Sequence, residues 1–154
     1  MEISIRSRFN QGSFREPSGA VPNNSTIVFE IQVPRSYGLK ETSIVWISDD
    51  DDEYQYIRMG WKGISGGRDI YEQQVEVKKQ GLVWYYFQLR TLSQVLYVGK
   101  GIDGHMVTEV EPPSWQLTVY DKDFKTPDWI KGGIYYHIFV DRFAKEGSGT
   151  VRKD

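Results

Sequence analysis

A pentapeptide near the middle of the chain has the spacing of a hydrolase nucleophile motif. GISGG, at residues 63–67, fits G-x-S-x-G, in which a serine sits on a sharp turn from a buried strand into a helix. Here a strand-like segment, 70–77, follows the motif. The histidines downstream are His105, on a glycine-flanked loop, and His137, in a short apolar run. The context that the motif needs is missing, so we interpret the pentapeptide as part of a hairpin loop.

An acidic run and the same two histidines are the candidates for metal chemistry. The run DDDDE at 49–53 could offer some of the about six to eight oxygens that calcium takes, but it lacks the D-x-D-x-D-G spacing that separates ligands. Neighbouring like charges favour a solvated loop instead. His105 and His137 lack the cysteine or histidine partners of a zinc site. From the residues alone we expect no metal and no other cofactor in this chain.

Aromatic side chains on the polar faces of strands indicate carbohydrate binding. Residues 82–90 alternate, and the odd-numbered positions are expected in the core, so Trp84 and Tyr86 should point outward. By the same alternation Tyr54 and Tyr56 should point away from the core. Exposed rings can stack on the apolar face of a glucose ring while polar neighbours bond its hydroxyl groups. The candidate carbohydrate-binding residues are therefore Trp84, Tyr86, Tyr54, Tyr56 and Arg58.

Two other interpretations of these aromatic residues stay open. The face that carries them could pack on another domain or on a second subunit, because exposed apolar patches mark protein partners as well as ligands. Alternatively, a single β-bulge would reverse the face assignment, since a shift of one residue moves every side chain to the other side of a sheet.

Eight segments with the two-residue alternation of strands would position these side chains. They are residues 3–5, 26–33, 43–47, 54–61, 70–77, 82–90, 95–98 and 115–120. Turn signals separate them at intervals of about 8–15 residues, as in the loops 14–25, 63–68 and 99–104, and no segment has convincing helical periodicity. The sequence therefore predicts an all-β fold, an antiparallel immunoglobulin-like β-sandwich of seven or eight strands.

Length and composition exclude several classes of protein. The chain has 154 residues, which is too few for a complete (β/α)8 barrel of about 250. It has no cysteine for disulfides or thiol chemistry, and its net charge of −2 gives no footprint for nucleic acid. It has neither a membrane-spanning apolar stretch of about 20 residues nor a signal-peptide run at its start. We expect a cytoplasmic protein without nucleic-acid or membrane partners.

A short apolar run near the C-terminus, 134–140, predicts a strand buried on both faces. It follows two glycines and is rich in aromatic and β-branched residues. Such strands belong to parallel sheets, and only loop-like residues follow this one, so its neighbours are missing. An unpaired hydrophobic strand seeks an edge. We expect this one to dock on its own sandwich or to pair with another copy.

The segment TPDWIKGGIYYHIFVDRF, residues 126–143, resembles the start of the catalytic barrel in the α-amylase family, glycoside hydrolase family 13. It is most similar to the neopullulanase, cyclomaltodextrinase and maltogenic amylase branch, in which a β-sandwich of carbohydrate-binding module family 34 precedes the barrel. The stretch FREPSGA at 14–20 resembles the beginning of such modules. His137 and Val140 stand where relatives often have Gln and Pro. The loop 144–148 replaces an Asn-Gly-Asp loop that helps to hold calcium in relatives, which puts that site in doubt.

The resemblance implies a parent enzyme that hydrolyses α-glucosidic bonds in starch, pullulan, cyclodextrin or maltooligosaccharides by the retaining, two-carboxylate mechanism. The carboxylates of that mechanism would lie on later barrel strands, so this chain is expected to hold no catalytic residue and to be inactive. Asp141 and Arg142 would form a structural ion pair. The expected domains are a β-sandwich at 1–121, a linker at 122–133, and the truncated first barrel strand with its following loop at 134–154.

The resemblance implies one of two functions for the sandwich domain. In the first, the domain binds α-glucan and positions the substrate for the barrel. In the second, it is a scaffold that mediates dimerisation and walls the active-site cleft without binding sugar itself. The expected partners are therefore an α-glucan oligosaccharide or polysaccharide, the catalytic barrel of the parent, and a second copy of the chain.

Overall fold

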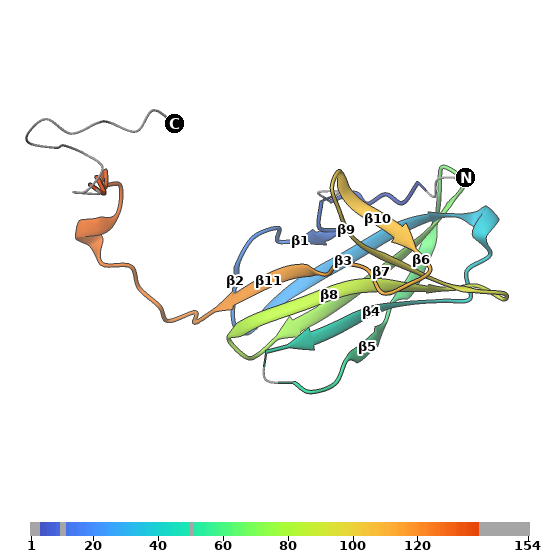
Figure 1. The fold of residues 1–154 in the computed structure, drawn as a ribbon, viewed down its shortest axis with the longest axis horizontal. Coiled ribbons are helices and arrows are strands. Elements are labelled where there is room, and N and C mark those ends of the chain that lie inside the picture. The colour runs from blue at the N-terminus through green and yellow to red at the C-terminus, as the bar shows by residue number, and fades with distance from the viewer. Residues whose placement is uncertain (1–3, 10–11, 50, 139–154) are drawn as a thin grey trace, which may run out of the picture. The chain divides into compact units, whose positions relative to one another are not determined.

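The computed structural model describes residues 4–9, 12–49 and 51–138 (Figure 1), and the chain divides into two compact units, Met1–Phe124 and Lys125–Asp154. The strands of the first unit are β1 (Arg15–Glu16), β2 (Val21–Pro22), β3 (Ser25–Pro34), β4 (Glu41–Ser48), β5 (Gln55–Arg58), β6 (Gly60–Ser65), β7 (Arg68–Val77), β8 (Gly81–Arg90), β9 (Val95–Gly101), β10 (Gly104–Thr108) and β11 (Trp115–Tyr120). A short 3-10 helix, η1 (Arg35–Tyr37), connects β3 to β4.

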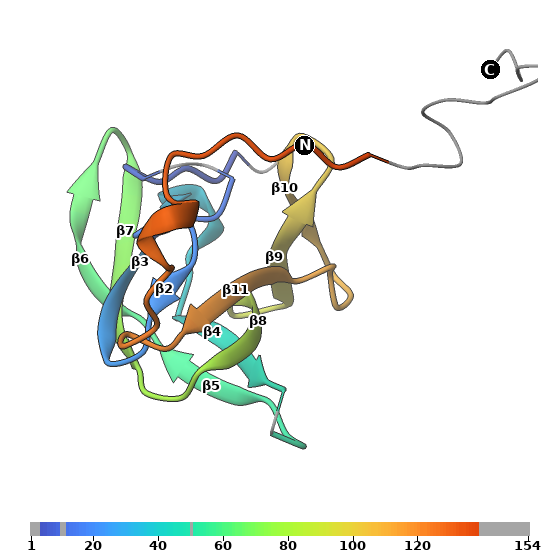
Figure 2. The ribbon, with the colours of Figure 1, turned by 90° about the vertical axis from the view of Figure 1, so that its left-hand side faces the viewer.

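These strands form two sheets that pack face to face (Figure 1, Figure 2). One sheet has the order β1-β3-β7-β6 and consists of antiparallel pairs. The other is centred on β8, which pairs with β4 along one edge and with β9 and β11 along the other. β5 and β10 extend this sheet, and β2 joins β11 as a parallel pair. The predicted all-β sandwich is therefore confirmed, with more strands than expected.

The core lies between the two sheets and is built from alternate residues of β3 and β8. Its largest contributors from these strands are Ile27, Phe29, Ile31, Val33, Val83, Tyr85, Phe87 and Leu89, all at most 5% exposed. The ring of Phe29 packs edge-on against those of Trp46, Tyr85 and Phe87, with centroids between 5.0 and 6.3 Å apart. The inward faces predicted for both strands are confirmed.

The segment 54–61, predicted as one strand, crosses from one sheet to the other. β5 pairs with β4, whereas β6 pairs with β7 in the opposite sheet. Met59, which lies between β5 and β6, is buried, and its backbone N–H donates to the carbonyl oxygen of Thr42 over 2.8 Å. The prediction of a single strand was wrong because alternation indicates which side chains point inward, but not which sheet the backbone joins.

Short elements account for the other differences from the predicted strands. β1 and β2 lie in the loop expected at 14–25, and β9 and β10 form a hairpin across the loop expected at 99–104. The residues 63–65, also expected in a loop, belong to β6. Of the strand predicted at 3–5, the described residues 4 and 5 lie in no strand, and the neighbouring Arg6 forms an isolated bridge with Gln32. Two-residue alternation is not visible in pieces of this length.

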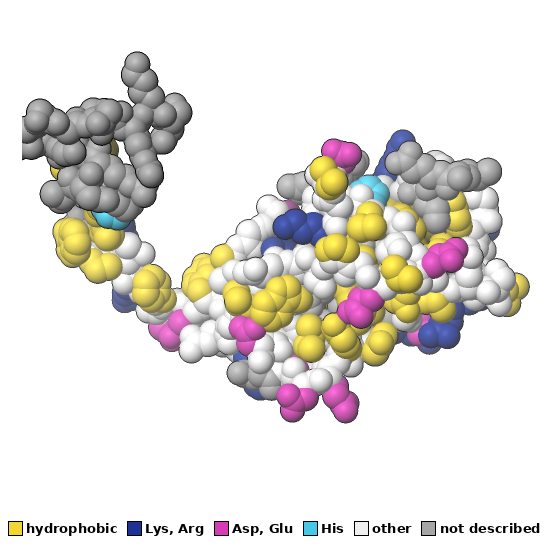
Figure 3. Space-filling model, in the orientation of Figure 1, with side chains coloured by type: hydrophobic (Ala, Val, Ile, Leu, Met, Phe, Trp, Pro, Cys, Tyr) yellow, Lys and Arg dark blue, Asp and Glu magenta, His cyan; other side chains and the backbone are white. Residues whose placement is uncertain are grey.

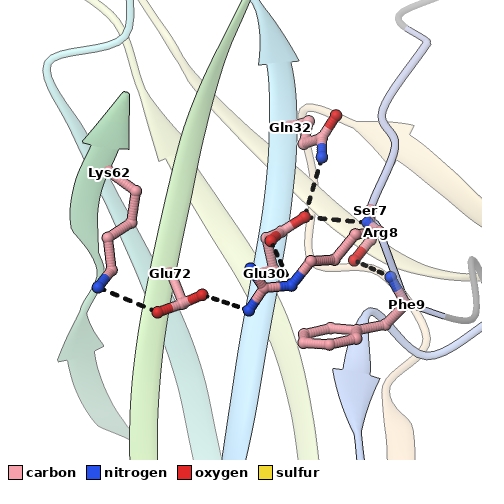
Figure 4. A network of polar contacts seen from close by, with 7 residues as sticks. All are labelled: Ser7, Arg8, Phe9, Glu30, Gln32, Lys62 and Glu72. Carbon is pink, nitrogen blue, oxygen red and sulfur yellow. Dashed lines mark hydrogen bonds and ion pairs between the residues drawn. The ribbon is translucent and has the colours of Figure 1, made fainter. Parts of the chain in front are cut away.

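A polar network holds the N-terminal segment on the outer face of the β3–β7 sheet (Figure 4). Glu30 of β3 lies directly opposite Glu72 of β7, and the two side chains are 2% and 11% exposed. Arg8 reaches both carboxylates, with Nε 3.0 Å from Glu30 Oε2 and Nη2 2.6 Å from Glu72 Oε2. Lys62 Nζ lies 3.1 Å from Glu72 Oε1, and Gln32 Nε2 donates to Glu30 Oε1 over 2.9 Å.

A buried arginine connects the loop at 14–20 to the core. Arg15 is 4% exposed, and its Nε–H donates to the hydroxyl oxygen of Tyr85 over 3.1 Å. A second N–H of Arg15 donates to the carbonyl oxygen of Gly19 over 3.0 Å. The Tyr85 hydroxyl donates in turn to the carbonyl oxygen of Ser13 over 2.8 Å. Burial raises the pKa of Tyr85 to about 12, although the neighbouring Arg15 cation opposes the shift.

The second unit differs from the prediction. A 3-10 helix, η2 (Asp128–Ile130), begins it, and residues 134–138, predicted as part of a barrel strand, lie in no strand. A strand exists by pairing with a neighbour, and no described segment pairs with 134–138, where Ile134 is 96% exposed. The rest of the predicted strand and the Asp141–Arg142 pair lie in 139–154, outside the described residues. The domain boundaries and the docking of this segment stay predictions.

Candidate functional site

The strand register places the predicted carbohydrate-binding residues on one face of a sheet. Tyr56 of β5 lies opposite Val45 of β4, and Val45 lies opposite Tyr86 of β8. Directly paired residues point to the same side of a sheet, so both tyrosines lie on the face turned away from the core. The neighbouring cross-strand rows carry Arg58 and Trp84. Hydrophobic side chains, with acidic ones among them, gather over β4, β5 and β8 in the space-filling view (Figure 3).

We call this surface the tyrosine face and define it by Tyr54, Tyr56, Arg58, Trp84, Tyr86 and Tyr97. Tyr86 lies at its centre, and the rings of Tyr54 and Tyr97 meet it edge-on, with centroids 6.1 and 5.9 Å away. Tyr86 is 4% exposed, so the expectation that it points into solvent was wrong. The alternation placed it on the correct face, but the aromatic neighbours that cover it come from other segments.

The remaining predicted residues are accessible to a ligand. Tyr54 and Tyr56 are 42% and 60% exposed. Trp84 is half-buried, and Arg58 is exposed. The outer layer of the tyrosine face therefore consists of Tyr54, Tyr56 and Trp84, and Tyr86 supports this layer from beneath.

A carboxylate from a distant segment completes the tyrosine face. The hydroxyl of Tyr54 donates to Oε1 of Glu111 over 2.7 Å. This hydrogen bond is the main cause that raises the pKa of Tyr54 above its ordinary value. The pKa of Tyr86 is raised as well, first by burial and then by the charge of Glu111. Both phenols stay protonated at neutral pH, and the ring of Tyr54 is held in place by its hydrogen bond.

Sequence reasoning missed two members of this site. Tyr97 lies opposite Gln88 in the pairing of β9 with β8, so the alternation of β9 contained a signal for it. Glu111 carries no local signal, since it lies in an irregular segment before two prolines and meets Tyr54 across 57 positions of the chain.

The arrangement suits non-covalent binding of a polyhydroxyl ligand. Flat rings on a supported face can stack on a pyranose ring, and the charged groups of Glu111 and Arg58 can bond its hydroxyls. Within residues 4–9, 12–49 and 51–138, no group of three or more His, Cys, Asp or Glu side chains is arranged to hold a metal ion. The described part of the chain also has no helix long and apolar enough to cross a membrane. The cytoplasmic location stays a prediction.

Comparisons with known proteins find amylopullulanases among the relatives of this chain. The chain is 33% identical over 137 residues to an amylopullulanase of Thermoanaerobacterium thermosulfurigenes, and 31% identical over 144 residues to one of Thermoanaerobacter thermohydrosulfuricus. These matches cover 84% and 89% of this chain but 7% and 10% of the relatives, so the chain spans about a tenth of their length or less. No family model matches the chain.

A solved structure shares the fold. A cyclomaltodextrinase superposes with a TM-score of 0.57 at 16% sequence identity, over 86% of this chain and 22% of that one. At this identity the likeness speaks for the β-sandwich alone.

Proposed function

We propose a function from the premise that this chain is a β-sandwich domain of the α-amylase family, homologous to a segment of the amylopullulanases. The domain is non-catalytic and binds α-glucan on the tyrosine face, so that substrate is held near the catalytic barrel of a parent enzyme. That parent acts on α-glucans such as starch, pullulan, cyclodextrins or maltooligosaccharides. Its catalytic carboxylates lie outside this chain, which we expect not to cleave maltooligosaccharides by itself.

The observation that carries the proposal is the exposed but fixed ring of Tyr54. Its hydroxyl is bonded to Glu111 (2.7 Å), and its ring packs against that of Tyr86 in an edge-to-face arrangement. A ring that is already ordered loses little conformational freedom when a ligand binds, so more of the contact energy appears as affinity. The neighbouring Tyr56 and Trp84 extend the aromatic surface, which suits successive glucosyl units.

The names of the relatives support the choice of ligand. The curated relatives are named amylopullulanases, and pullulan is an α-glucan. We assign the same class of ligand to the tyrosine face, without choosing between linkage types.

Replacing Tyr54 or Tyr56 by alanine is expected to weaken maltoheptaose binding roughly tenfold each, which corresponds to about 1.4 kcal/mol. The reason is that each change removes one exposed ring of the tyrosine face while both positions lie outside the buried core. Isothermal titration calorimetry with the purified chain measures the effect. Maltoheptaose that gives no heat and no tryptophan fluorescence change at millimolar concentration contradicts the proposal.

Tyr120→Ala is a matched control for these variants. Tyr120 is 43% exposed, close to the 42% of Tyr54, and lies at the end of β11. Its replacement should leave sugar affinity unchanged. A loss of affinity equal to that of Tyr54→Ala would show that the sugar response does not come from the tyrosine face.

A scaffold function is the second candidate, and one observation favours it. A hollow of about 460 Å³ beside the end of β11 is lined by Gly81, Val119, Tyr120 and Phe124, and Tyr120 and Phe124 are 43% and 70% exposed. Exposed apolar surface of this kind fits a protein partner. The same Tyr120→Ala variant tests the alternative. If the domain is a scaffold that dimerises through this surface, light scattering should show that the variant no longer self-associates. Added sugar should then change neither the unsubstituted chain nor any variant.

A further inference from the structure

A second hollow, of about 380 Å³, lies where the chain crosses between the two sheets. Ligand clefts have volumes of about 300–1,000 Å³, so this one is large enough for a small ligand. It is bordered by Met59, at the crossing, and by Trp61, on the edge strand β6. Among the residues that define the tyrosine face, Arg58 alone borders this hollow. The two surfaces are therefore distinct sites that meet at one residue.

Trp61 is exposed and yet held in a fixed orientation. Trp61 is 57% exposed, and its indole Nε1–H donates a hydrogen bond of 3.0 Å to Oδ1 of Asp69. Asp69 is held in turn by Arg35, whose Nε lies 3.6 Å from the same oxygen. Trp61 is also paired with Tyr71 across β6 and β7. An exposed indole with its edge tied down offers a flat apolar surface at low entropic cost.

The other walls of the hollow are polar and nearly balanced in charge. Thr42 also borders it, although its hydroxyl oxygen is almost fully inaccessible and is therefore not offered to a ligand. Lys40, Glu41 and Arg58, also on the wall, enter no ion pair with the described part of the chain. Mixed charges with free hydrogen-bonding capacity suit a neutral sugar better than an anion.

We propose that this hollow is a second saccharide site, which takes a glucosyl unit or chain end of a neutral α-glucan. The Trp61 indole stacks on the sugar ring, the charged groups of Lys40 and Glu41 bond its hydroxyls, and Asp69 positions the indole. The choice of an α-glucan rests on the proposed function, whereas the hollow and its fixed tryptophan do not. Two sites on one domain hold a long glucan more firmly than either alone, because the second contact becomes intramolecular.

Nuclear magnetic resonance of the ¹⁵N-labelled full chain, titrated with maltoheptaose, tests the two sites together. Each tryptophan gives one indole N–H resonance, assigned by single Trp→Phe variants. Trp84 reports on the tyrosine face, and Trp61 reports on the hollow. Trp46 and Trp115 are 6% and 5% exposed and should not move. Trp129 is 79% exposed in the other unit, so it reports non-specific stacking of sugar on exposed indole.

The outcomes separate the two proposals. Saturable shifts of Trp84 and Trp61, with Trp129 unmoved, support both. A shift of Trp84 alone overturns the second site and leaves the proposed function unaffected. A shift of Trp61 alone overturns sugar binding on the tyrosine face and leaves the second site unaffected. Neither resonance moving, or Trp129 moving as much as Trp61, overturns both. Because the ligand is neutral, the affinity should survive high salt, and a Trp61 response that added salt abolishes overturns the assignment to a sugar.

A substitution with a matched control tests the residue that carries the second site. Trp61→Ala should weaken binding of long α-glucan at least several-fold while the Trp84 shift persists. Ile64→Ala, 49% exposed on the same strand, is the matched control, and an equal loss there overturns the site.

Discussion

Replacing Arg8 by alanine is expected to lower the free energy of unfolding by about 1–3 kcal/mol, because the buried carboxylate of Glu30 loses its cation while the Arg8 side chain, 55% exposed, is partly screened by solvent. Arg8 is the cation that reaches both Glu30 and Glu72, which lie directly opposite each other on β3 and β7. Like charges in directly opposed positions destabilise a sheet. Without Arg8, Lys62 still neutralises Glu72, but Glu30 keeps a carboxylate with a 2% exposed side chain and loses its ion-pair partner.

Urea unfolding followed by circular dichroism measures the effect, and the chain offers a matched control. Lys78 lies 3.7 Å from Glu76 on the same sheet, but that carboxylate belongs to a side chain that is 54% exposed. Lys78→Ala should therefore cost less than about 1 kcal/mol. A loss for Arg8→Ala no larger than that for Lys78→Ala would contradict our account of the network.

A double variant sharpens the prediction, because a second substitution should restore stability. Combining Arg8→Ala with Glu30→Met removes the buried charge together with its partner and fills the space with an apolar side chain of similar size. Replacing both members of a buried pair is often neutral. The double variant should then be more stable than Arg8→Ala alone, which is the reverse of what two independent losses would give.

Alternation predicted the central strands well because their surroundings are simple. β3, β8 and β11 each have one face against the core over their whole length, so every second residue is buried there, and residues such as Phe29 and Leu117 are fully buried. The crossing at Met59 shows the limit of this signal. Its side chain points inward as the alternation requires, but the hydrogen bonds before and after it belong to different sheets. Which sheet each part of this segment joins is decided by pairing partners that are distant in the sequence.

The candidate site likewise has a part that the sequence pattern predicted and a part that it did not. The face that carries Tyr54, Tyr56 and Trp84 followed from the period of the strands, because the pleat sends alternate side chains to opposite sides. The burial of Tyr86 did not follow, since its cover comes from Tyr97 and the segment before β5. The second hollow was invisible for a related reason. Its wall joins Thr42, Trp61 and residues of β7, which the fold gathers at one end of the sandwich.

Raising the pH is expected to destabilise the fold through Tyr85, and this is the second large effect. Burial raises the pKa of Tyr85 to about 12, above the value near 10 of an exposed tyrosine. The folded state therefore keeps the proton in a range where the unfolded chain has released it. The stabilisation from this group is fully present below about pH 10 and is lost as the pH rises towards 12, by about 3 kcal/mol in all.

Tyr85→Phe separates this contribution from those of the other tyrosines. At neutral pH the variant should be less stable by about 1–3 kcal/mol, because the Nε–H of Arg15 and the carbonyl oxygen of Ser13 lose the hydroxyl that bonds them. Between about pH 10 and 12 its free energy of unfolding should fall less steeply than that of the unsubstituted chain, so the two curves converge. Tyr120→Phe, at an exposed position, should change neither the stability nor the slope. If the free energies of unfolding of Tyr85→Phe and of the unsubstituted chain fall in parallel with pH, Tyr85 ionises as easily in the folded state as in the unfolded state. That result would contradict the described role of its hydroxyl in connecting Arg15 to the loop.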